Sequence, residues 1–402
     1  MTKIFALKGK IQNYAWGGNE YIPNLLGISK EDKKYAEYWM GAHVNAPSVI
    51  QSAEGDVNLD AFLNHHLEES LGVKVKSTFG KLPFLFKVLD VNDMLSIQVH
   101  PTKIEAEKGF KHENELGIPL SAPHRNYKDD NHKPEIMVAL SEFWLLHGFL
   151  SEEKITKVLS TVPEFSELLH VFNEKGYYGL YKTVMEQSQE ETNHVLKPLA
   201  ERILPLYKRG ELSKFDPGFW AAKAIENETG TSIDKGIYSI YFFNIVRVES
   251  GDAVFQDAGI PHAYLEGQNM ELMANSDNVL RGGLTPKHID VQELLKHVAF
   301  KETIPNIIKG DNQSDGLERI YKSPAPDFEL SQIKLNGQKP YVGNSKSAQI
   351  LIVIDGRVNL SDESGATLQL NNGESAFIMA KCEYSISSNS SAVIYKATTP
   401  CN

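Results

Sequence analysis

Short apolar runs, punctuated by glycine, proline and asparagine, occupy both ends of this chain, and a stretch of helical periodicity separates them. In the first 150 residues such runs lie at 84–89, 94–100 and 135–140. Several short strands punctuated in this way are typical of a β-sandwich or a small β-barrel. One helical element is expected in the same region, at 58–71, where leucine and phenylalanine recur at helical spacing.

A segment of helical character interrupts the β-rich pattern between residues 151 and 229. Ser151 precedes two glutamates and then apolar residues at helical spacing, so it is expected to be the N-cap of the first helix. The β-rich pattern returns from about residue 237. We therefore expect a first β unit formed by residues 1–150 and 230–300, a helical insert at 151–229, a linker at 301–319 and a second β unit at 320–402.

A weak internal repeat relates the two β units. Residues 251–258 and 373–380, which are 122 positions apart, share the pattern Gly-acidic-x-x-Phe-x-x-Ala. A glycine and an acidic residue before an alternating run indicate a turn leading into a strand, as in jelly-roll barrels. Four matched positions can also arise by chance. If the repeat is real, the chain carries two related barrels, and Tyr384 aligns with His262.

Charge and cysteine content narrow the classes of function. Lys and Arg number 41 against 52 Asp and Glu, and this net charge of −11 disfavours sequence-independent binding to nucleic acid or to an anionic membrane. Two cysteines, Cys382 and Cys401, are too few for a disulfide framework or a Cys-rich zinc site. No apolar run approaches the roughly 20 residues of a transmembrane helix, and no signal-peptide core is evident. We expect a cytoplasmic protein, monomeric or weakly homo-oligomeric.

Four residues make a candidate metal site. Gln98 and His100 are two positions apart on an expected strand and therefore share one face. Glu135 begins another expected strand, and His262 follows a Gly-Ile-Pro turn. Each has an ordinary alternative when taken singly: an exposed strand face, a strand-start acid or a hydrogen-bonded histidine. Together they form a nitrogen and oxygen donor set that suits zinc, although manganese, iron or cobalt also fit this ligand type.

A cationic loop follows further along the chain. Arg281 and Lys287 flank the pair Gly282-Gly283, which would let the backbone approach a ligand closely. Arginine can bind a phosphate through two hydrogen bonds, whereas lysine offers a point charge. The ordinary alternative is a solvated loop with two basic residues. Two cations close together in a chain of negative net charge favour a local anion site.

Two neighbouring segments carry a long and specific motif. They read GIPHAY at 259–264 and ELMANSDNVLRGGLT at 271–285. Supporting stretches are QNYAWG at 12–17, AEYWMGAH at 36–43 and FLFKVL at 84–89, together with residues 95–100 and 131–135. In these segments the chain resembles the type I mannose-6-phosphate isomerase (phosphomannose isomerase) family of the cupin superfamily. The likeness spans roughly residues 4–300, and beyond them it is only general.

This resemblance implies a mainly β fold: two cupin-type (jelly-roll) β-barrels with an inserted α-helical domain. It implies an aldose–ketose isomerase that interconverts mannose 6-phosphate and fructose 6-phosphate, so the expected partner is a small-molecule sugar phosphate. It also implies one zinc ion per chain, bound by Gln98, His100, Glu135 and His262. The substrate pocket that it implies consists of Ser96, Lys87, Lys133, Tyr264, Glu271, Asp277, Arg281 and Lys287.

The reaction itself assigns roles to these residues. Moving a proton between C1 and C2 through a cis-enediol requires a group that polarises the carbonyl, a base, and a grip on the distant phosphate. Arg281 fits either beside the enediolate, as a catalytic residue, or on the phosphate. The other phosphate-binding candidates are Lys87 and Lys287, with Ser96 as a hydrogen-bond donor. The candidate proton carriers, among which the sequence does not choose, are Lys133, His132, Glu271 and Asp277.

Two other classes of function stay open. Another cupin-fold metalloenzyme, such as an oxygenase or an epimerase, is one; however, an iron oxygenase uses two histidines and one carboxylate, so Gln98 as a fourth ligand argues against it. A non-catalytic protein that binds sugar phosphates is the other, and it would need neither a metal nor Lys133. Because Tyr384 replaces a metal-binding histidine in the repeat, we expect the second barrel to be free of metal.

Overall fold

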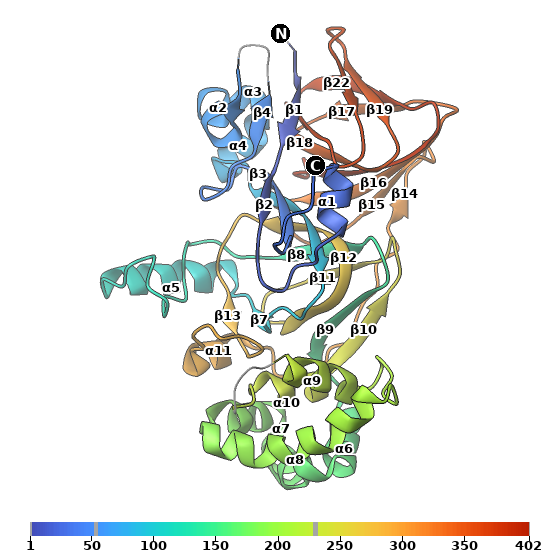
Figure 1. Ribbon diagram of the computed structural model, residues 1–402. Helices are drawn as coiled ribbons and strands as arrows, with labels where there is room; N and C mark the ends of the chain where they lie inside the picture. The colour runs from blue at the N-terminus through green and yellow to red at the C-terminus, as the bar shows by residue number, and fades with distance from the viewer. Residues whose placement is uncertain (1, 52–54, 228–231, 402) are drawn as a thin grey trace.

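The computed structural model of the chain describes residues 2–51, 55–227 and 232–401. A bundle of helices forms one end of the molecule, an N-terminal β unit lies in the middle, and a C-terminal β unit forms the other end (Figure 1). The expected boundary between insert and β unit at residues 229–230 lies outside the described residues. No helix in the described ranges has the length and apolar character needed to cross a bilayer.

The N-terminal β unit consists of two facing layers. The layer that we call the inner layer has the order β2-β3-β6-β12-β8-β11, and the outer layer has the order β10-β9-β12-β7-β13. The strands of the unit are β2 (Lys10–Gln12), β3 (Glu37–Gly41), β6 (Phe84–Val91), β7 (Gln98–Val99), β8 (Glu135–Ala139), β9 (Phe143–Phe149), β10 (Phe243–Val248), β11 (Ala253–Gln256), β12 (His262–Ala274) and β13 (Leu280–Arg281).

Strand β12 belongs to both layers and joins them. Its first residues pair with β7 and β9, whereas the part from Gly267 onward pairs with β6 and β8. Gly267 lies at the corner with a φ of 121°, and a Cβ there would lie 2.5 Å from the carbonyl oxygen of Glu142. The corner therefore requires glycine both for its backbone conformation and for space.

The C-terminal β unit is also a two-layer sandwich, and the N-terminal strand of the chain is part of it. Its large sheet has the order β14-β15-β16-β23-β18-β21-β1-β4-β5, and its small sheet has the order β17-β22-β19-β20. The strands are β1 (Ile4–Lys8), β4 (Val49–Gln51), β5 (Val57–Asn58), β14 (Asp311–Asn312), β15 (Glu318–Tyr321), β16 (Glu329–Asn336), β17 (Tyr341–Ser345), β18 (Gln349–Asp355), β19 (Val358–Asp362), β20 (Thr367–Leu370), β21 (Ser375–Ile378), β22 (Cys382–Ser387) and β23 (Ser391–Thr398).

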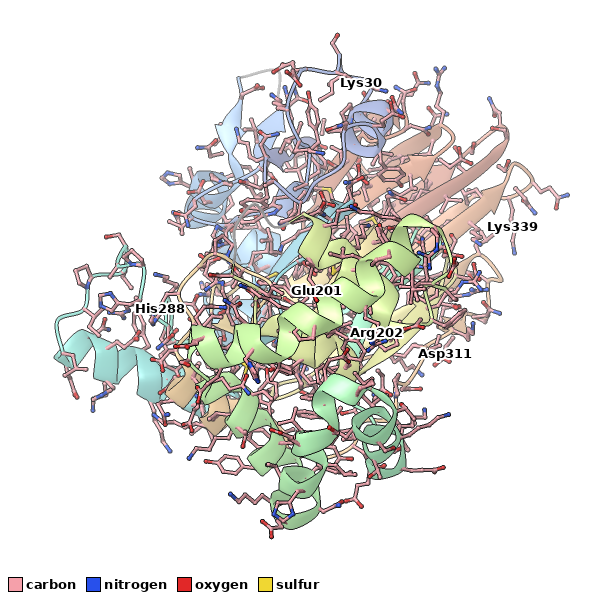
Figure 2. The ribbon with its side chains drawn as sticks, turned by 60° about the horizontal axis from the view of Figure 1, so that its bottom comes forward. Lys30, Glu201, Arg202, His288, Asp311 and Lys339 are labelled. Carbon is pink, nitrogen blue, oxygen red and sulfur yellow. The ribbon has the colours of Figure 1, made fainter. Side chains whose placement is uncertain are left out.

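Helices form from residue 152 onward as the periodicity predicted, but the insert extends further than expected: residues 236–242, where the β-rich pattern was expected to return, form helix α10, and strand β10 begins only at Phe243. Ser151 is the N-cap of α6, since its side chain accepts a hydrogen bond from the backbone N–H of Lys154. Arg202 lies on α8 in the insert (Figure 2). Its guanidinium donates two hydrogen bonds to the carboxylate of Glu164. The insert contains α6 (Glu152–Thr161), a 3₁₀ turn (Pro163–Phe165), α7 (Ser166–Glu186), α8 (Gln189–Lys208), α9 (Pro217–Glu226) and α10 (Gly236–Phe242).

Other helices flank the β units. The expected helix at 58–71 is present as two consecutive helices that meet at His66. These elements are α1 (Tyr21–Leu26), α2 (Leu59–His65), α3 (Leu67–Leu71), α4 (Val73–Phe79), α5 (Lys103–Glu115) and α11 (Val291–His297).

Four of the apolar cores show how the elements pack on one another along the molecule. The outer layer packs on the insert through a core that includes Ile97, Leu146 and Trp220. The inner layer packs on the C-terminal unit through residues such as Phe86 and Ile350. A third core fills the C-terminal sandwich, and a smaller one lies between the inner and outer layers. The interior of the N-terminal unit is thus enclosed on both sides, and its polar residues share a protected space.

The predicted fold class, mainly β with a helical insert, is confirmed, and among the described residues each β unit is an open two-layer sandwich with no closed barrel. The internal repeat has a structural counterpart. Its two copies form β11 and β21, and these strands pair antiparallel with β8 and β18 respectively. Strand β21 of the second unit therefore corresponds to β11 of the first, and its partner β18 corresponds to β8.

Candidate metal centre and active site

Three side chains that are distant in sequence meet in the interior of the N-terminal unit. His100, Glu135 and His262 each offer one ligand atom, and these atoms lie within 4.8 Å of one another. Nε2 of His100 is 3.4 Å from one carboxylate oxygen of Glu135, and Nε2 of His262 is 3.3 Å from the other. All three residues are buried. The expected grouping of these residues is therefore present.

Each histidine is oriented by a hydrogen bond from its other ring nitrogen. Nδ1 of His100 lies 2.9 Å from the carbonyl oxygen of Asn278, and Nδ1 of His262 lies 2.9 Å from that of Ile260. Because a carbonyl only accepts, each Nδ1 carries the proton and each Nε2 presents a lone pair. Both Nε2 atoms are buried without a hydrogen-bond partner. Lone pairs facing a carboxylate are repelled unless a cation lies between them, so this donor set fits a divalent metal ion.

Local electrostatics keep the cluster in its metal-binding protonation state. Burial alone would raise the pKa of Glu135, but the charge of Lys133, whose Nζ is 3.2 Å away, and the two histidines hold that pKa well below its ordinary value. Burial lowers the pKa of His100 to about 4. At neutral pH the cluster thus consists of a carboxylate and a neutral imidazole, and no proton competes with a metal at either group.

Gln98 enters this interior through its place in the sheet. In the outer layer His147 pairs with His262, His262 with Gln98, and Gln98 with Arg281. Directly paired residues of antiparallel strands project from the same face. A row of four side chains therefore runs across β9, β12, β7 and β13 toward the metal cluster. This placement agrees with Gln98 as a further ligand, which stays a prediction.

The strand that carries Gln98 is shorter than predicted. The expected strand at 94–100 is reduced to β7 (Gln98–Val99), and His100 follows its end. The alternation holds nevertheless, because Ile97 and Val99 are fully buried in the core shared with the insert while His100 faces the opposite way, toward Glu135. Polar residues on one face and apolar residues on the other fix the register of this segment.

A second charged cluster lies on the inner layer beside the metal cluster. Lys87 pairs directly with Glu271 across β6 and β12, and its Nζ is 2.9 Å from Glu271 and 3.3 Å from Glu37. Burial opposes the charge of Lys87, but Glu271 and Glu37 outweigh burial and raise its pKa above the ordinary value. The ammonium also lies 5.1 Å from the ring centre of Trp39. Lys87 is therefore a buried cation already shared by two carboxylates.

Two further candidate residues have raised pKa values. Burial raises the pKa of Glu271, against the opposing charge of Lys87. Burial, together with Glu271, raises the pKa of Tyr264 well above its ordinary value. Both side chains are buried, so a neutral phenol stands close to a carboxyl group that holds its proton more strongly than usual.

Asp277 and His132 are each bound to a partner outside the metal cluster. Nε2 of His43 lies 3.2 Å from Asp277, and its influence overcomes burial and lowers the pKa of Asp277. Nε2 of His132 lies 2.8 Å from the buried Asp327, which precedes β16 of the C-terminal unit. His132 thus links the two β units.

Arg281 and Lys287 form the cationic side of the site. Among the described residues neither has an ion pair with a carboxylate within 4.0 Å. Burial lowers the pKa of Arg281; burial and then the charge of Arg281 lower the pKa of Lys287. The two cations are therefore close enough to repel each other, which favours an anion between them. Ser96 precedes the same segment as Gln98 and is half-buried.

The Gly282-Gly283 turn packs closely against the insert; the expected approach of its backbone to a ligand stays a prediction. Gly283 has a φ of 124°, and a Cβ there would lie 2.4 Å from Cα of Gly236. A Cβ on Gly282 would lie 2.8 Å from the hydroxyl oxygen of Tyr181. The glycines thus let the cationic loop dock closely against the helices, and this contact fixes where Arg281 stands.

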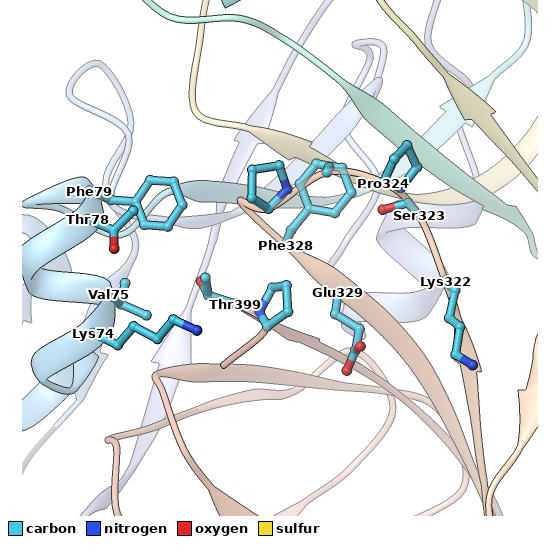
Figure 3. Close-up of a pocket in the computed structure, with 13 residues that line it drawn as sticks. Lys74, Val75, Thr78, Phe79, Lys322, Ser323, Pro324, Phe328, Glu329 and Thr399 are labelled. Atoms are coloured by element: carbon cyan, nitrogen blue, oxygen red, sulfur yellow. The ribbon is translucent and has the colours of Figure 1, made fainter. Parts of the chain in front are cut away.

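A cavity of about 440 Å³ lies elsewhere, between α4 and the C-terminal unit (Figure 3). Its walls include Lys74, Phe79, Phe328 and Thr399 (Figure 3). None of the predicted site residues lines it. This cavity is therefore separate from the candidate metal site.

Sequence reasoning missed four polar residues of the interior: Glu37, His43, His147 and Gln256. Glu37 and His43 lie inside the AEYWMGAH motif, so the motif was a usable signal for them. Gln256 lies inside the internal repeat, which predicts a turn and a strand there but no site residue. His147 stands in an apolar strand, and nothing in its neighbours marks it.

Fold and donor set together define a protein of two jelly-roll-like sandwiches, with a nitrogen and oxygen site for a divalent metal inside the first. Residues 4–151 match the sequence model described as "Phosphomannose isomerase type I, catalytic domain". The chain is 37% identical to the mannose-6-phosphate isomerase of Escherichia coli K12, over 93% of this chain and 94% of that protein. It is 34% identical to the human enzyme of the same name, over 94% of each.

A comparison with solved structures leads to the same family as the sequence matches. The Salmonella typhimurium mannose 6-phosphate isomerase bound to substrate (f6p) and zinc superposes with a TM-score of 0.89 at 34% identity, covering 100% of both chains. The chain belongs to the type I mannose-6-phosphate isomerase family.

Proposed function

We propose that this chain is a zinc-dependent aldose–ketose isomerase that interconverts mannose 6-phosphate and fructose 6-phosphate. The observation that carries the proposal is the pair of buried, partnerless Nε2 atoms of His100 and His262 on either side of the Glu135 carboxylate. Support comes from the family and from the zinc and substrate reported for the Salmonella relative.

Gln98, His100, Glu135 and His262 would hold the ion. When bound, a divalent ion with these ligands supplies a Lewis acid that polarises the carbonyl or hydroxyl oxygens at C1 and C2 of the sugar. Because one ligand is anionic and three are neutral, the site keeps a net positive charge for this purpose. Lys133 forms an ion pair with Glu135, so we propose that it positions that carboxylate.

We propose Glu271 as the group that moves the proton between C2 and C1. It is buried, it lies two positions from Met273, which pairs with Glu135, and it therefore shares the face of the metal cluster. Its raised pKa brings the carboxyl group closer to the range in which it can both accept and return a proton. A single carboxylate that serves both carbons is what a cis-enediol route requires.

The other candidates suit this step less well. Asp277 has a lowered pKa and is therefore a weaker base. His132 is bound to Asp327 of the C-terminal unit, and Lys133 is engaged with a metal ligand. We propose a structural role for Asp277, through its contact with His43, and for His132, through its contact with Asp327. Tyr264 is proposed to form a hydrogen bond with the substrate.

Arg281 and Lys287 are the proposed phosphate-binding residues. They are the cations of the site without a carboxylate partner in the described part of the chain, whereas Lys87 is shared by Glu37 and Glu271. A dianionic phosphate would relieve their mutual repulsion. Lys87 is better suited to fixing Glu271 in place than to binding phosphate, and Ser96 stays a proposed hydrogen-bond donor to the substrate.

The C-terminal unit is proposed to be structural. The repeat aligns Tyr384 with His262, and strand pairing places Gln349 where the first unit has Glu135. The hydroxyl of Tyr384 donates to Oε1 of Gln349 at 2.7 Å. The two uncharged groups thus form a hydrogen bond with each other and need no cation between them. Anomalous diffraction at the zinc edge should show a peak in the N-terminal unit and none near Tyr384.

Both cysteines are unpaired, which agrees with the proposed cytoplasmic location, where thiols stay reduced. The sugar phosphate is the proposed partner, and a monomer or weak homo-oligomer is the proposed assembly.

Metal analysis of the purified protein with a coupled assay on mannose 6-phosphate tests the proposal. His100→Ala and His262→Ala should each lower bound zinc sharply and abolish turnover, because each removes a ligand. His170→Ala serves as the matched control, since His170 is an exposed histidine of α7 far from the cluster in sequence and fold. Full activity of the wild-type protein after exhaustive chelation would refute the proposed function.

A further inference from the structure

Two buried polar side chains, His147 and Gln256, are paired with ligands of the metal cluster, and the proposed mechanism does not use them. His147 on β9 pairs directly with His262, and Gln256 on β11 pairs directly with Glu135. Directly paired residues share a face. His147 and Gln256 therefore point into the same interior as the two ligands, one from each layer.

These two side chains bond to each other across the interior. Nδ1 of His147 donates to Oε1 of Gln256 at 2.7 Å. Gln256 is 0% exposed and His147 is 5% exposed. Because Oε1 accepts from His147, the amide is held in one orientation, with its NH₂ group directed away from the imidazole.

The NH₂ group of Gln256 has no hydrogen-bond partner in this structure, although it is fully buried. A buried donor without an acceptor costs about 1–3 kcal/mol. Cβ atoms of directly opposed residues lie about 4.5–5.5 Å apart, so the carboxylate of Glu135 is within reach of this amide. In the present arrangement both oxygens of Glu135 face histidine nitrogens instead.

The second β unit offers an internal comparison. There the repeat aligns Ile378 with Gln256, and Ile378 pairs with Gln349 as Gln256 pairs with Glu135. The strand pairing also places Asp362 opposite Tyr384, where the first unit has His147 opposite His262. In the described part of the chain, this pairing of a buried amide with an imidazole is thus found in the unit with the carboxylate and two histidines and not at the matching positions of the other unit. Their presence tracks the metal site rather than the fold that both units share.

We propose that Gln256 and His147 are positioning residues of the metal site: when the ion is bound, Nε2 of Gln256 donates to the Glu135 carboxylate, and His147 fixes the amide in the orientation that allows this. The inference rests on the proposed metal site. Hydrogen bonds to a ligating carboxylate restrict its rotation and so raise metal affinity; their loss typically costs 10–100-fold. The pair acts through Glu135 and does not touch the substrate.

The test measures zinc affinity by chelator competition in the full-length protein. Gln256→Met keeps nearly the same volume but removes the donor, and it should weaken zinc binding by about 10–100-fold. His147→Phe should weaken binding in the same direction, and His147→Gln, which can still donate to Oε1, should restore most of it. Gln349→Met is the matched control, because Gln349 is a buried glutamine of the second unit that accepts a hydrogen bond from the hydroxyl of Tyr384. This variant should bind zinc with unchanged affinity.

Cobalt substitution gives a second readout, because the visible absorption of Co²⁺ reports its ligand geometry. Gln256→Met should shift or weaken these bands, while thermal unfolding of the metal-free protein checks that the variant folds. Zinc affinity within twofold of wild type with an unchanged cobalt spectrum would overturn the inference. If Gln256→Met does not fold, the same result for His147→Phe overturns it. Failure of the wild-type protein to bind zinc would instead refute the proposed function.

Discussion

Arg281 offers the sharpest test of how the substrate is held. It lies on β13, paired with Gln98, and no carboxylate of the described residues lies within ion-pair distance of it. Its charge is therefore available to a ligand. Replacing Arg281 with Ala removes hydrogen bonds to a charged group, which contribute about 1.5–3 kcal/mol. At 1.4 kcal/mol per tenfold, kcat/KM for mannose 6-phosphate should fall by about 10–150-fold.

The kinetic pattern distinguishes the two roles that the sequence left open for Arg281. If it binds phosphate, KM should rise, inhibition by inorganic phosphate should weaken by a similar factor, and turnover of unphosphorylated mannose should be unchanged. If it stands beside the enediolate, kcat should fall for both sugars while phosphate inhibition stays the same. Arg281→Lys is the control that keeps the charge. An Arg281→Ala variant that binds phosphate as well as wild type would refute the phosphate assignment.

Three further outcomes are expected. Glu271→Gln should lower kcat by about 10²–10⁴-fold while the zinc content stays that of wild type. The activity of the wild-type enzyme should fall at acid pH with a pKa above that of an ordinary glutamate. An unchanged kcat in Glu271→Gln would exclude Glu271 as the base. Lys87→Met should reduce the free energy of unfolding by about 3–5 kcal/mol, since Glu37 and Glu271 lose their buried counter-charge; a loss under about 1 kcal/mol in urea titrations contradicts this. Burial lowers the pKa of His147 from 6.5 to about 4, so between pH 6.5 and pH 4 the unfolded state binds a proton that the folded state does not. The free energy of unfolding of the metal-free protein should therefore fall by about 3 kcal/mol between these pH values. The His147→Phe variant should show a smaller fall over the same range.

Local patterns were sufficient where the structure is local. Ser151 caps α6 as predicted, because an N-cap bond joins residues three apart. The i, i+2 spacing of Gln98 and His100 likewise predicted their common face, since strand alternation is a property of neighbouring residues. The motif at 259–264 identified His262, which follows a turn and begins strand β12.

Long-range pairing was beyond sequence patterns. Strand β1 joins β21, which pairs Phe5 with Phe377, so the chain's first strand completes the C-terminal sheet. The Gly282-Gly283 turn contacts Gly236 of the insert, a partner that the sequence pattern did not predict. In both cases the partner lies far along the chain, and no local periodicity records which surface a segment will meet.

The sequence alone determined most classes of element, the start of the helical insert and the kinds of donor atom available, because these follow from residue type and spacing; the apolar run at 237–242 was expected to be strand and is helix α10, buried among the other helices of the insert. Tertiary structure decided which donors share one interior: β12 bends at Gly267 and brings His262 to Glu135, and the ladder sets His147 and Gln256 behind them. Convergence of this sort depends on strand register across distant segments, which the whole packed core fixes at once.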